Sequence, residues 1–183
     1  IICIAIGIPI GIVMSKSDRV EKAVVPVLDM MQTIPSFVYL VPILMLLGIG
    51  KVPGLIAVCI YALPPVVRLT NLGIRLVDKD VIEAANAFGM SNRQKLLGVE
   101  IPLALPNIMA GINQTIMMSL SMVVIASLVS APGLGVLVLR GIRNLELGVG
   151  LIAGLGIVLL AVVLDRTSKG ALTRINKSQH QDK

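Results

Sequence analysis

The residues of this chain that could do chemistry are few and far apart. Its single histidine, His180, lies in a polar tail, where a solvated side chain is expected. Cys3 and Cys59 each lie in an apolar run, which argues against a disulfide framework or a metal cluster. Gly50 and Lys51 have a partial likeness to a phosphate-binding loop, but no Ser or Thr follows the lysine. We therefore predict a non-enzymatic chain that binds no cofactor or metal itself.

The composition indicates a membrane protein. Hydrophobic residues make up 56% of the chain and charged residues 14%, and the mean hydropathy is +0.94. Soluble domains carry about 25% charged residues. Although the net charge is +6, the basic residues flank apolar runs without interleaved aromatics, which argues against nucleic-acid binding.

The apolar runs predict an all-α integral membrane protein with about five transmembrane helices. Because the chain begins inside an apolar run, we expect the first helix to be truncated. Residues 23–33 are expected to form a helix at the membrane interface or one leading at an angle into the next span. Residues 130–147 are read as a connection, residues 1–166 as the transmembrane domain and 167–183 as a cytoplasmic polar tail. The expected spans are 1–14, 34–49, 55–69, 103–129 and 148–164.

The distribution of lysine and arginine predicts the orientation. If residues 15–22 face the cytoplasm, 13 of the 16 basic residues lie on that side, and only Lys51, Arg140 and Arg143 lie on the other. This split follows the excess of positive charge in cytoplasmic loops. The polar stretch 83–102 is then cytoplasmic.

That stretch, EAANAFGMSNRQKLLGVEIP, carries the signals of two short helices. Asp80 with Glu83, and Ser91 with Gln94, each fit a capping box at a helix start. Gly89 lies between them, where a left-handed residue would end the first helix.

The first of these helices has a face suited to contact with another surface. Val81, Ala84, Ala85 and Phe88 share that face at helical spacing. The small alanines allow close approach, and Phe88 could anchor a partner. The alternative is an ordinary interfacial loop in which Glu83 only completes the cap.

Glu83-Ala84-Ala85, three residues, Gly89, nine residues and then Val99-x-Ile101-Pro102 closely resemble the cytoplasmic "EAA" loop of ABC-importer permeases. That family has Ile-x-Leu-Pro at the end, so the departure is conservative. The resemblance implies a coupling loop at about 78–102 that docks on a separate ATPase. It assigns the docking set Glu83, Ala84, Ala85, Phe88 and Gly89, with Pro102 as the junction to the fourth span.

Three further stretches, MQTIPSFVYLVPILMLLGIG, ALPPVVRLTNLGI and GINQTIMMSLSMVVIASLVSAPGLG, resemble permeases of glycine betaine/proline-type osmoprotectant importers. The resemblance implies the five-span core of type I importer permeases, in a multi-pass protein of the bacterial cell membrane. The implied partners are an ABC ATPase that holds ATP and magnesium, an extracytoplasmic binding protein or domain, and a second permease copy or paralogue. The alternatives are a secondary transporter or channel with no ATPase, and a membrane scaffold.

Polar residues in the fourth span are candidates for the translocation pathway, because such residues face a cavity or a partner helix. Interhelical hydrogen bonding is the alternative role. Pro64 and Pro65 are expected to break or bend the third span, either beside the pathway or as a kink repaired by neighbouring helices. The candidate lining residues are Asn113, Gln114, Thr115, Ser119, Ser121, Pro64 and Pro65.

The aromatic content bears on the cargo. Quaternary ammonium ligands are held by aromatic cages, and this chain has only Phe37, Tyr39, Tyr61 and Phe88. Tight binding is therefore expected of a separate binding protein. The spans do not select among glycine betaine, proline, choline and carnitine.

Overall fold

The computed structural model describes residues 1–129 and 133–180, and every regular element in these ranges is a helix. The chain forms two compact units. One holds Ile1–Leu28 and Leu63–Gln114, and the other holds Asp29–Ala62 and Thr115–Lys183. Each unit is described by itself below.

The first unit is built on close contacts between helices. It contains α1 (Ile2–Lys16), the start of α2 (Asp18–Thr33), the second half of α4 (Lys51–Arg75) and the first half of α7 (Ile101–Val129). A Cβ added at Gly7 would lie 2.3 Å from Val66, and one at Gly11 would lie 2.8 Å from the carbonyl oxygen of Val67. The Gly-x-x-x-Gly pattern of α1 therefore serves helix packing, as small residues do in membranes.

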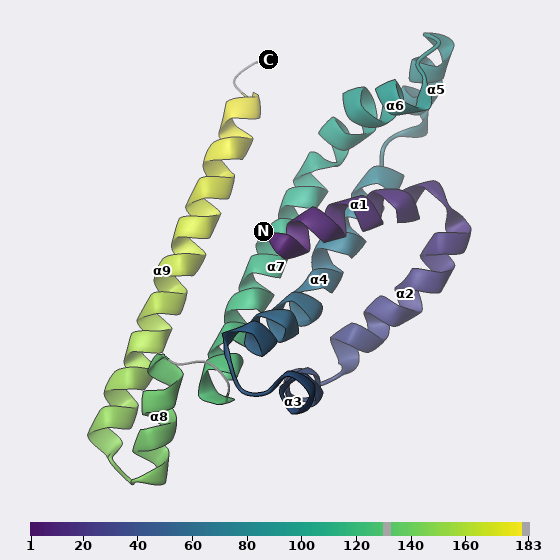
Figure 1. Cartoon of the computed structure of the whole chain (residues 1–183). Coiled ribbons are helices and arrows are strands. Elements are labelled where there is room, and N and C mark those ends of the chain that lie inside the picture. The colour runs from purple at the N-terminus through teal and green to yellow at the C-terminus, as the bar shows by residue number, and fades with distance from the viewer. Residues whose placement is uncertain (130–132, 181–183) are drawn as a thin grey trace. The chain divides into compact units, whose positions relative to one another are not determined.

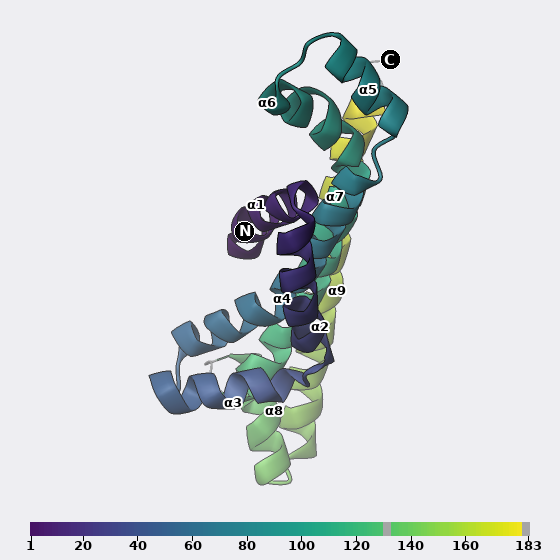
Figure 2. The ribbon, with the colours of Figure 1, turned by 90° about the vertical axis from the view of Figure 1, so that its right-hand side faces the viewer.

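Helices α5 (Lys79–Ala87) and α6 (Asn92–Lys95) complete this unit and project beyond the ends of α4 and α7 (Figures 1 and 2). Between α6 and α7 the helix widens into a π-turn, η1 (Leu96–Glu100). Ile101 donates its N–H to the carbonyl of Leu96 across this turn. Pro102 follows directly, and it has no N–H to donate to residue 98. The wider turn accommodates the proline without interrupting the helix.

The second unit packs α3 (Ser36–Leu47) against the first half of α4 and the second half of α7. Its core consists of Leu40, Ala57, Met122 and Ala126. Helices α2 and α3 meet at a bend of 94°, where Pro35 precedes α3. The expected span 34–49 contains the single helix α3, but its 12 residues are too few to cross a membrane unless α2 is counted with it.

Helix α8 (Leu134–Arg143) lies within residues 130–147, which were expected from the sequence to be a connection between two spans. It packs beside the first half of α9 (Leu147–His180), as Figure 1 shows. A Cβ at Gly141 would lie 2.6 Å from the backbone of Gly150, and one at Gly156 would lie 3.4 Å from Leu134. These pairs make α8 antiparallel to α9. Gly150 is thus a packing residue, whereas a Cβ at Gly154 would meet nothing within 4 Å.

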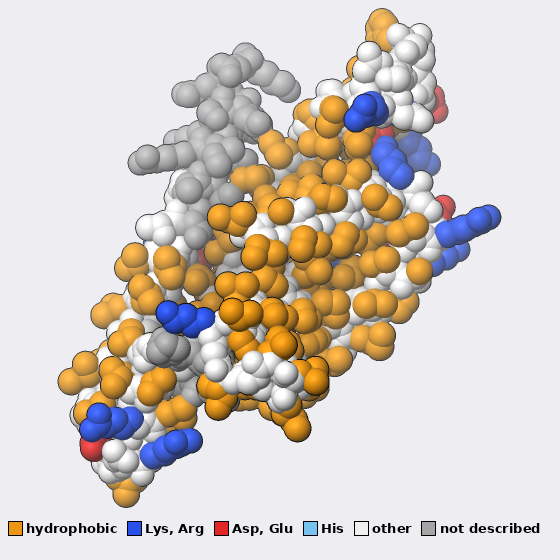
Figure 3. All heavy atoms as spheres, in the orientation of Figure 1, with side chains coloured by type: hydrophobic (Ala, Val, Ile, Leu, Met, Phe, Trp, Pro, Cys, Tyr) orange, Lys and Arg blue, Asp and Glu red, His pale blue; other side chains and the backbone are white. Residues whose placement is uncertain are grey.

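Within the described residues, three helices are long and apolar enough to cross a membrane, and the bent α2–α3 pair allows a fourth. The shorter apolar helix α1 lies at the position of the first expected span, so the helix count agrees roughly with the expected five. Helix α4 runs unbroken through Pro64 and Pro65. Of the predicted break or bend, the break is wrong, because both prolines are buried against neighbours that support the helix. The bend stays a prediction. Hydrophobic side chains cover most of the visible surface (Figure 3), as expected for a protein in lipid.

Candidate functional site: the α5–α6 helix pair

The start of α5 differs from the sequence prediction. Asp78 is the N-cap, and its side chain accepts a hydrogen bond from the N–H of Asp80 at 3.0 Å. Asp80 is therefore already inside the helix, and the predicted Asp80–Glu83 capping box is wrong. Asp78 and Asp80 are equivalent candidates by residue type, and the helix begins at the earlier one. Glu83 consequently has no capping role and is exposed.

The turn between the two helices has the predicted geometry. Gly89 has φ +71°, the left-handed conformation that glycine adopts without steric cost. The N–H of Gly89 binds the carbonyl of Asn86 at 2.9 Å, and the N–H of Met90 binds that of Ala85 at 3.1 Å. These two bonds form a Schellman motif that closes the last turn of α5.

Helix α6 is capped and tied back to α5. The capping box of Ser91 and Gln94 is confirmed, with both reciprocal bonds present. Lys95 donates to the side chain of Asn86 at 2.9 Å. The α5–α6 helix pair is therefore held by local bonds and presents a shape defined largely by its own sequence.

The docking residues expected from the sequence differ in exposure on this helix pair. Ala85 is buried between the helices and contributes to the shape of the pair. Glu83, Ala84 and Gly89 are exposed, and Phe88 is 87% exposed at the end of α5. An exposed large aromatic side chain is typical of a partner-binding surface. Pro102 lies at the start of α7, just after the π-turn, and is exposed.

A polar network below the helix pair was missed by sequence reasoning. Lys16 at the end of α1 pairs with the buried carboxylate of Glu100 in η1. Arg75, the last residue of α4, bonds Asp18 at 2.7 Å and lies 3.1 Å from Glu21. Because Lys16 and Glu100 are 84 residues apart, no local pattern predicts their contact.

The candidate pathway residues occupy different faces of α7. Gln114 and Ser121 are exposed, whereas Thr115 is buried. Ser119 donates to the carbonyl of Thr115 at 2.8 Å, and Ser121 donates to that of Met117 at 3.1 Å. These hydroxyl groups bond within their own helix, which is a common solution for serine in apolar surroundings. Asn113 is half-buried. The exposed stripe along α7 consists of Leu103, Pro106, Ala110, Gln114, Met117 and Ser121.

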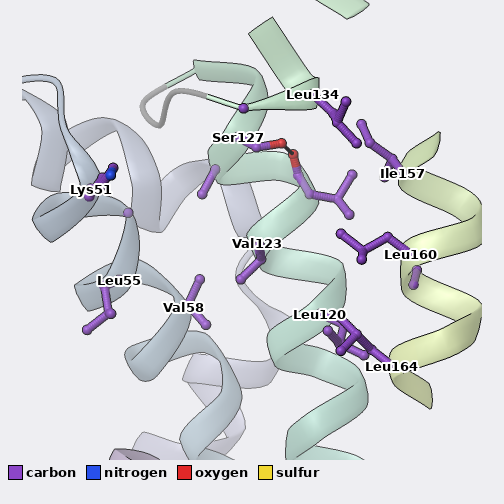
Figure 4. Close-up of a pocket in the computed structure, with 15 residues that line it drawn as sticks. Lys51, Leu55, Val58, Leu120, Val123, Ser127, Leu134, Ile157, Leu160 and Leu164 are labelled. Carbon is purple, nitrogen blue, oxygen red and sulfur yellow. Dashed lines mark hydrogen bonds between the residues drawn. The ribbon is translucent and has the colours of Figure 1, made fainter. Parts of the chain in front are cut away.

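The second unit contains a cavity of about 420 Å³ between α4, α7, α8 and α9 (Figure 4). Its walls are aliphatic, with the side chains of Lys51 and Ser127 as the polar groups in the lining. Ser127 donates to the carbonyl of Val124 at 2.7 Å. None of the described residues that line the cavity is aromatic, so their chemistry does not match an aromatic cage for a quaternary ammonium group.

Comparison with known proteins identifies the family. Residues 5–176 match the family model described as "Binding-protein-dependent transport system inner membrane component". The chain belongs to this family. As a member of it, the chain is a multi-pass membrane protein, in agreement with its apolar helices.

Similar proteins of this transport family include the glycine betaine/proline betaine transport system permease protein ProW of Escherichia coli, 55% identical over 97% of this chain and 50% of the relative. The glycine betaine transport system permease protein OpuAB of Bacillus subtilis is 51% identical over 92% of this chain and 60% of the relative. The chain thus spans about half the length of the Escherichia coli relative.

A solved structure supports the fold of this family member. The methionine ABC transporter MetNI, in an inward-facing conformation, matches with a TM-score of 0.76 and 19% identity. The match covers 94% of this chain and 87% of the other. The likeness shows a fold shared with a type I importer permease.

Proposed function

We propose that this chain is the membrane-spanning permease subunit of an ATP-driven importer for compatible solutes such as glycine betaine. The observation that carries the proposal is the exposed face of the α5–α6 helix pair, with Phe88 beside the left-handed turn at Gly89. Identity of 55% to a glycine betaine/proline betaine permease supports the substrate class.

In this proposal the ATPase, and not this chain, holds ATP and magnesium, and it docks on the helix pair from the cytoplasm. The 13-to-3 distribution of basic residues supports that orientation. Closure of the ATPase pair would draw two permease copies together at their helix pairs and open the pathway outward. An extracytoplasmic binding protein would supply the affinity for the solute and release it into this pathway.

Uptake measurements test the proposed function. In proteoliposomes that contain the full-length permease, its ATPase and its binding protein, uptake of labelled glycine betaine should require both internal ATP and the binding protein. Excess unlabelled proline, choline and carnitine, added singly, should rank the cargo. Uptake that persists without ATP and follows an ion gradient would instead identify a secondary transporter.

The exposed stripe of α7 is the proposed lining of the pathway. Gln114 and Ser121 supply weak polarity to this stripe, while the adjacent Thr115 is buried in the single chain. Polar groups in a membrane helix face a cavity or a partner, and a weakly polar wall would let a zwitterion pass without holding it.

We expect Gln114→Cys, with Cys3 and Cys59 replaced by alanine, to react with a trimethylammonium methanethiosulfonate in the assembled transporter. The reaction should block most uptake. Thr115→Cys is the matched control and should remain largely unmodified because its side chain is buried. Equal modification at the two positions would contradict the proposed lining.

A further inference from the structure

The junction between α1 and α2, residues 14–21, is called the elbow here. It contacts both ends of the segment that carries the α5–α6 helix pair. Helix α4 ends at Arg75, four residues before α5 begins, and η1 ends at Glu100, five residues after α6 ends. The elbow pairs with Arg75 on one side and with Glu100 on the other.

The contact with Arg75 is made of several hydrogen bonds. Its Nη2 atom donates to Asp18 at 2.7 Å and to the carbonyl of Met14 at 3.2 Å, and it lies 3.1 Å from Glu21. Asn71 accepts from Arg75 Nε at 3.2 Å and donates to Glu21 at 2.7 Å. One guanidinium therefore joins the last turn of α1, the first turn of α2 and the end of α4 in a geometry specific to arginine.

The contact with Glu100 is a single ion pair with a buried partner. Glu100 is 4% exposed, and its carboxylate pairs with Lys16 Nζ. A buried carboxylate without a partner is strongly unfavourable, so Lys16 must follow Glu100 if η1 moves. Glu100 lies in the π-turn just before Pro102, and π-turns are frequent at functional positions in helices.

We infer that the elbow is a positioning element that transmits movement of the α5–α6 helix pair to α1 and α2. Lys16 and Asp18 are its positioning residues. The elbow is bonded to Arg75 before α5 and to Glu100 after α6. A movement of the helix pair that carries either residue with it must therefore move the elbow as well or break these bonds. This inference rests on the proposed function, because the movement in question follows ATPase docking.

The test uses the complete transporter in proteoliposomes and compares solute taken up per ATP hydrolysed. Lys16→Met should lower this ratio at least about fivefold, the size typical of coupling between sites, while the ATPase still co-purifies. Lys16→Arg, which keeps the charge, should preserve the ratio. Lys22→Met is the matched control, since Lys22 lies directly after the elbow in α2, is exposed and forms no ion pair within the described ranges.

A second variant covers the case in which Lys16→Met fails to assemble. Asp18→Asn removes one carboxylate from Arg75 at a position that is 75% exposed, so no charge is left buried. It should also lower the ratio while leaving ATPase binding intact. The inference would be overturned if Asp18→Asn and an assembled Lys16→Met both left the solute taken up per ATP hydrolysed unchanged. It would also be overturned if these variants lost ATPase binding to the same extent as uptake. Failure of the unmodified permease to retain its ATPase would count against the proposed function instead.

Discussion

Phe88→Ala is expected to weaken binding of the ATPase at least about 30-fold, because an exposed aromatic anchor at the centre of an interface contributes roughly 2 kcal/mol or more. Phe88 is 87% exposed and caps the end of α5, so its removal should leave the helix pair folded. The measurement is ATPase affinity, titrated against permease in nanodiscs.

Phe37→Ala is the matched control for that experiment. Phe37 is the other phenylalanine of the chain and is 51% exposed, but it lies in α3. The same loss of aromatic surface there should leave ATPase affinity unchanged. Equal effects at the two positions would mean that Phe88 is no specific anchor.

Gly89→Val should abolish ATP-dependent uptake by changing the backbone of the turn. Gly89 has φ +71°, a conformation that costs an ordinary L-residue about 1–2 kcal/mol and a β-branched residue more. Valine would favour rearrangement of the Schellman turn and so misplace Phe88. We expect ATP-dependent uptake to be lost while the amount of permease in the membrane stays normal.

Gly89→Asn separates backbone strain from direct contact. Asparagine tolerates the left-handed conformation, and a Cβ at this position meets no atom of the chain within 4 Å. If the backbone conformation is what matters, this variant should retain most uptake. If both variants lose uptake equally, the partner itself contacts Gly89 closely, and the explanation from strain is wrong.

Local signals predicted the helix pair well. The Ser91–Gln94 capping box and the left-handed Gly89 depend on neighbouring residues only, and both are confirmed. The start of α5 was misplaced, because Asp78 and Asp80 are both competent caps. The sequence alone does not decide which of two aspartates, two positions apart, caps the helix.

The break expected at Pro64 and Pro65 is wrong for a physical reason. Helix α4 passes through both prolines, just as α7 contains Pro106, which the expected span 103–129 included. In a bundle, neighbouring helices support the backbone where a proline removes a hydrogen bond. Pro35 behaves as expected and marks the bend between α2 and α3.

Helix α8 and the Lys16–Glu100 pair were not predicted from the sequence, for different reasons. Helix α8 was missed because Gly133 and Gly135 suggested a loop, although its leucines and valines with Arg140 and Arg143 form an amphipathic pattern. The pairing of Lys16 with Glu100 depends on how α1 packs against α4 and η1, and no spacing rule reports it.

The most direct test of ATPase docking at the α5–α6 helix pair is site-specific photocrosslinking in the assembled transporter. A benzophenone amino acid at position 88 should form an adduct with the ATPase on irradiation, and the same group at position 37 should not. A transporter that remains active with the crosslinker at position 88 but forms no adduct with the ATPase would contradict docking at this surface.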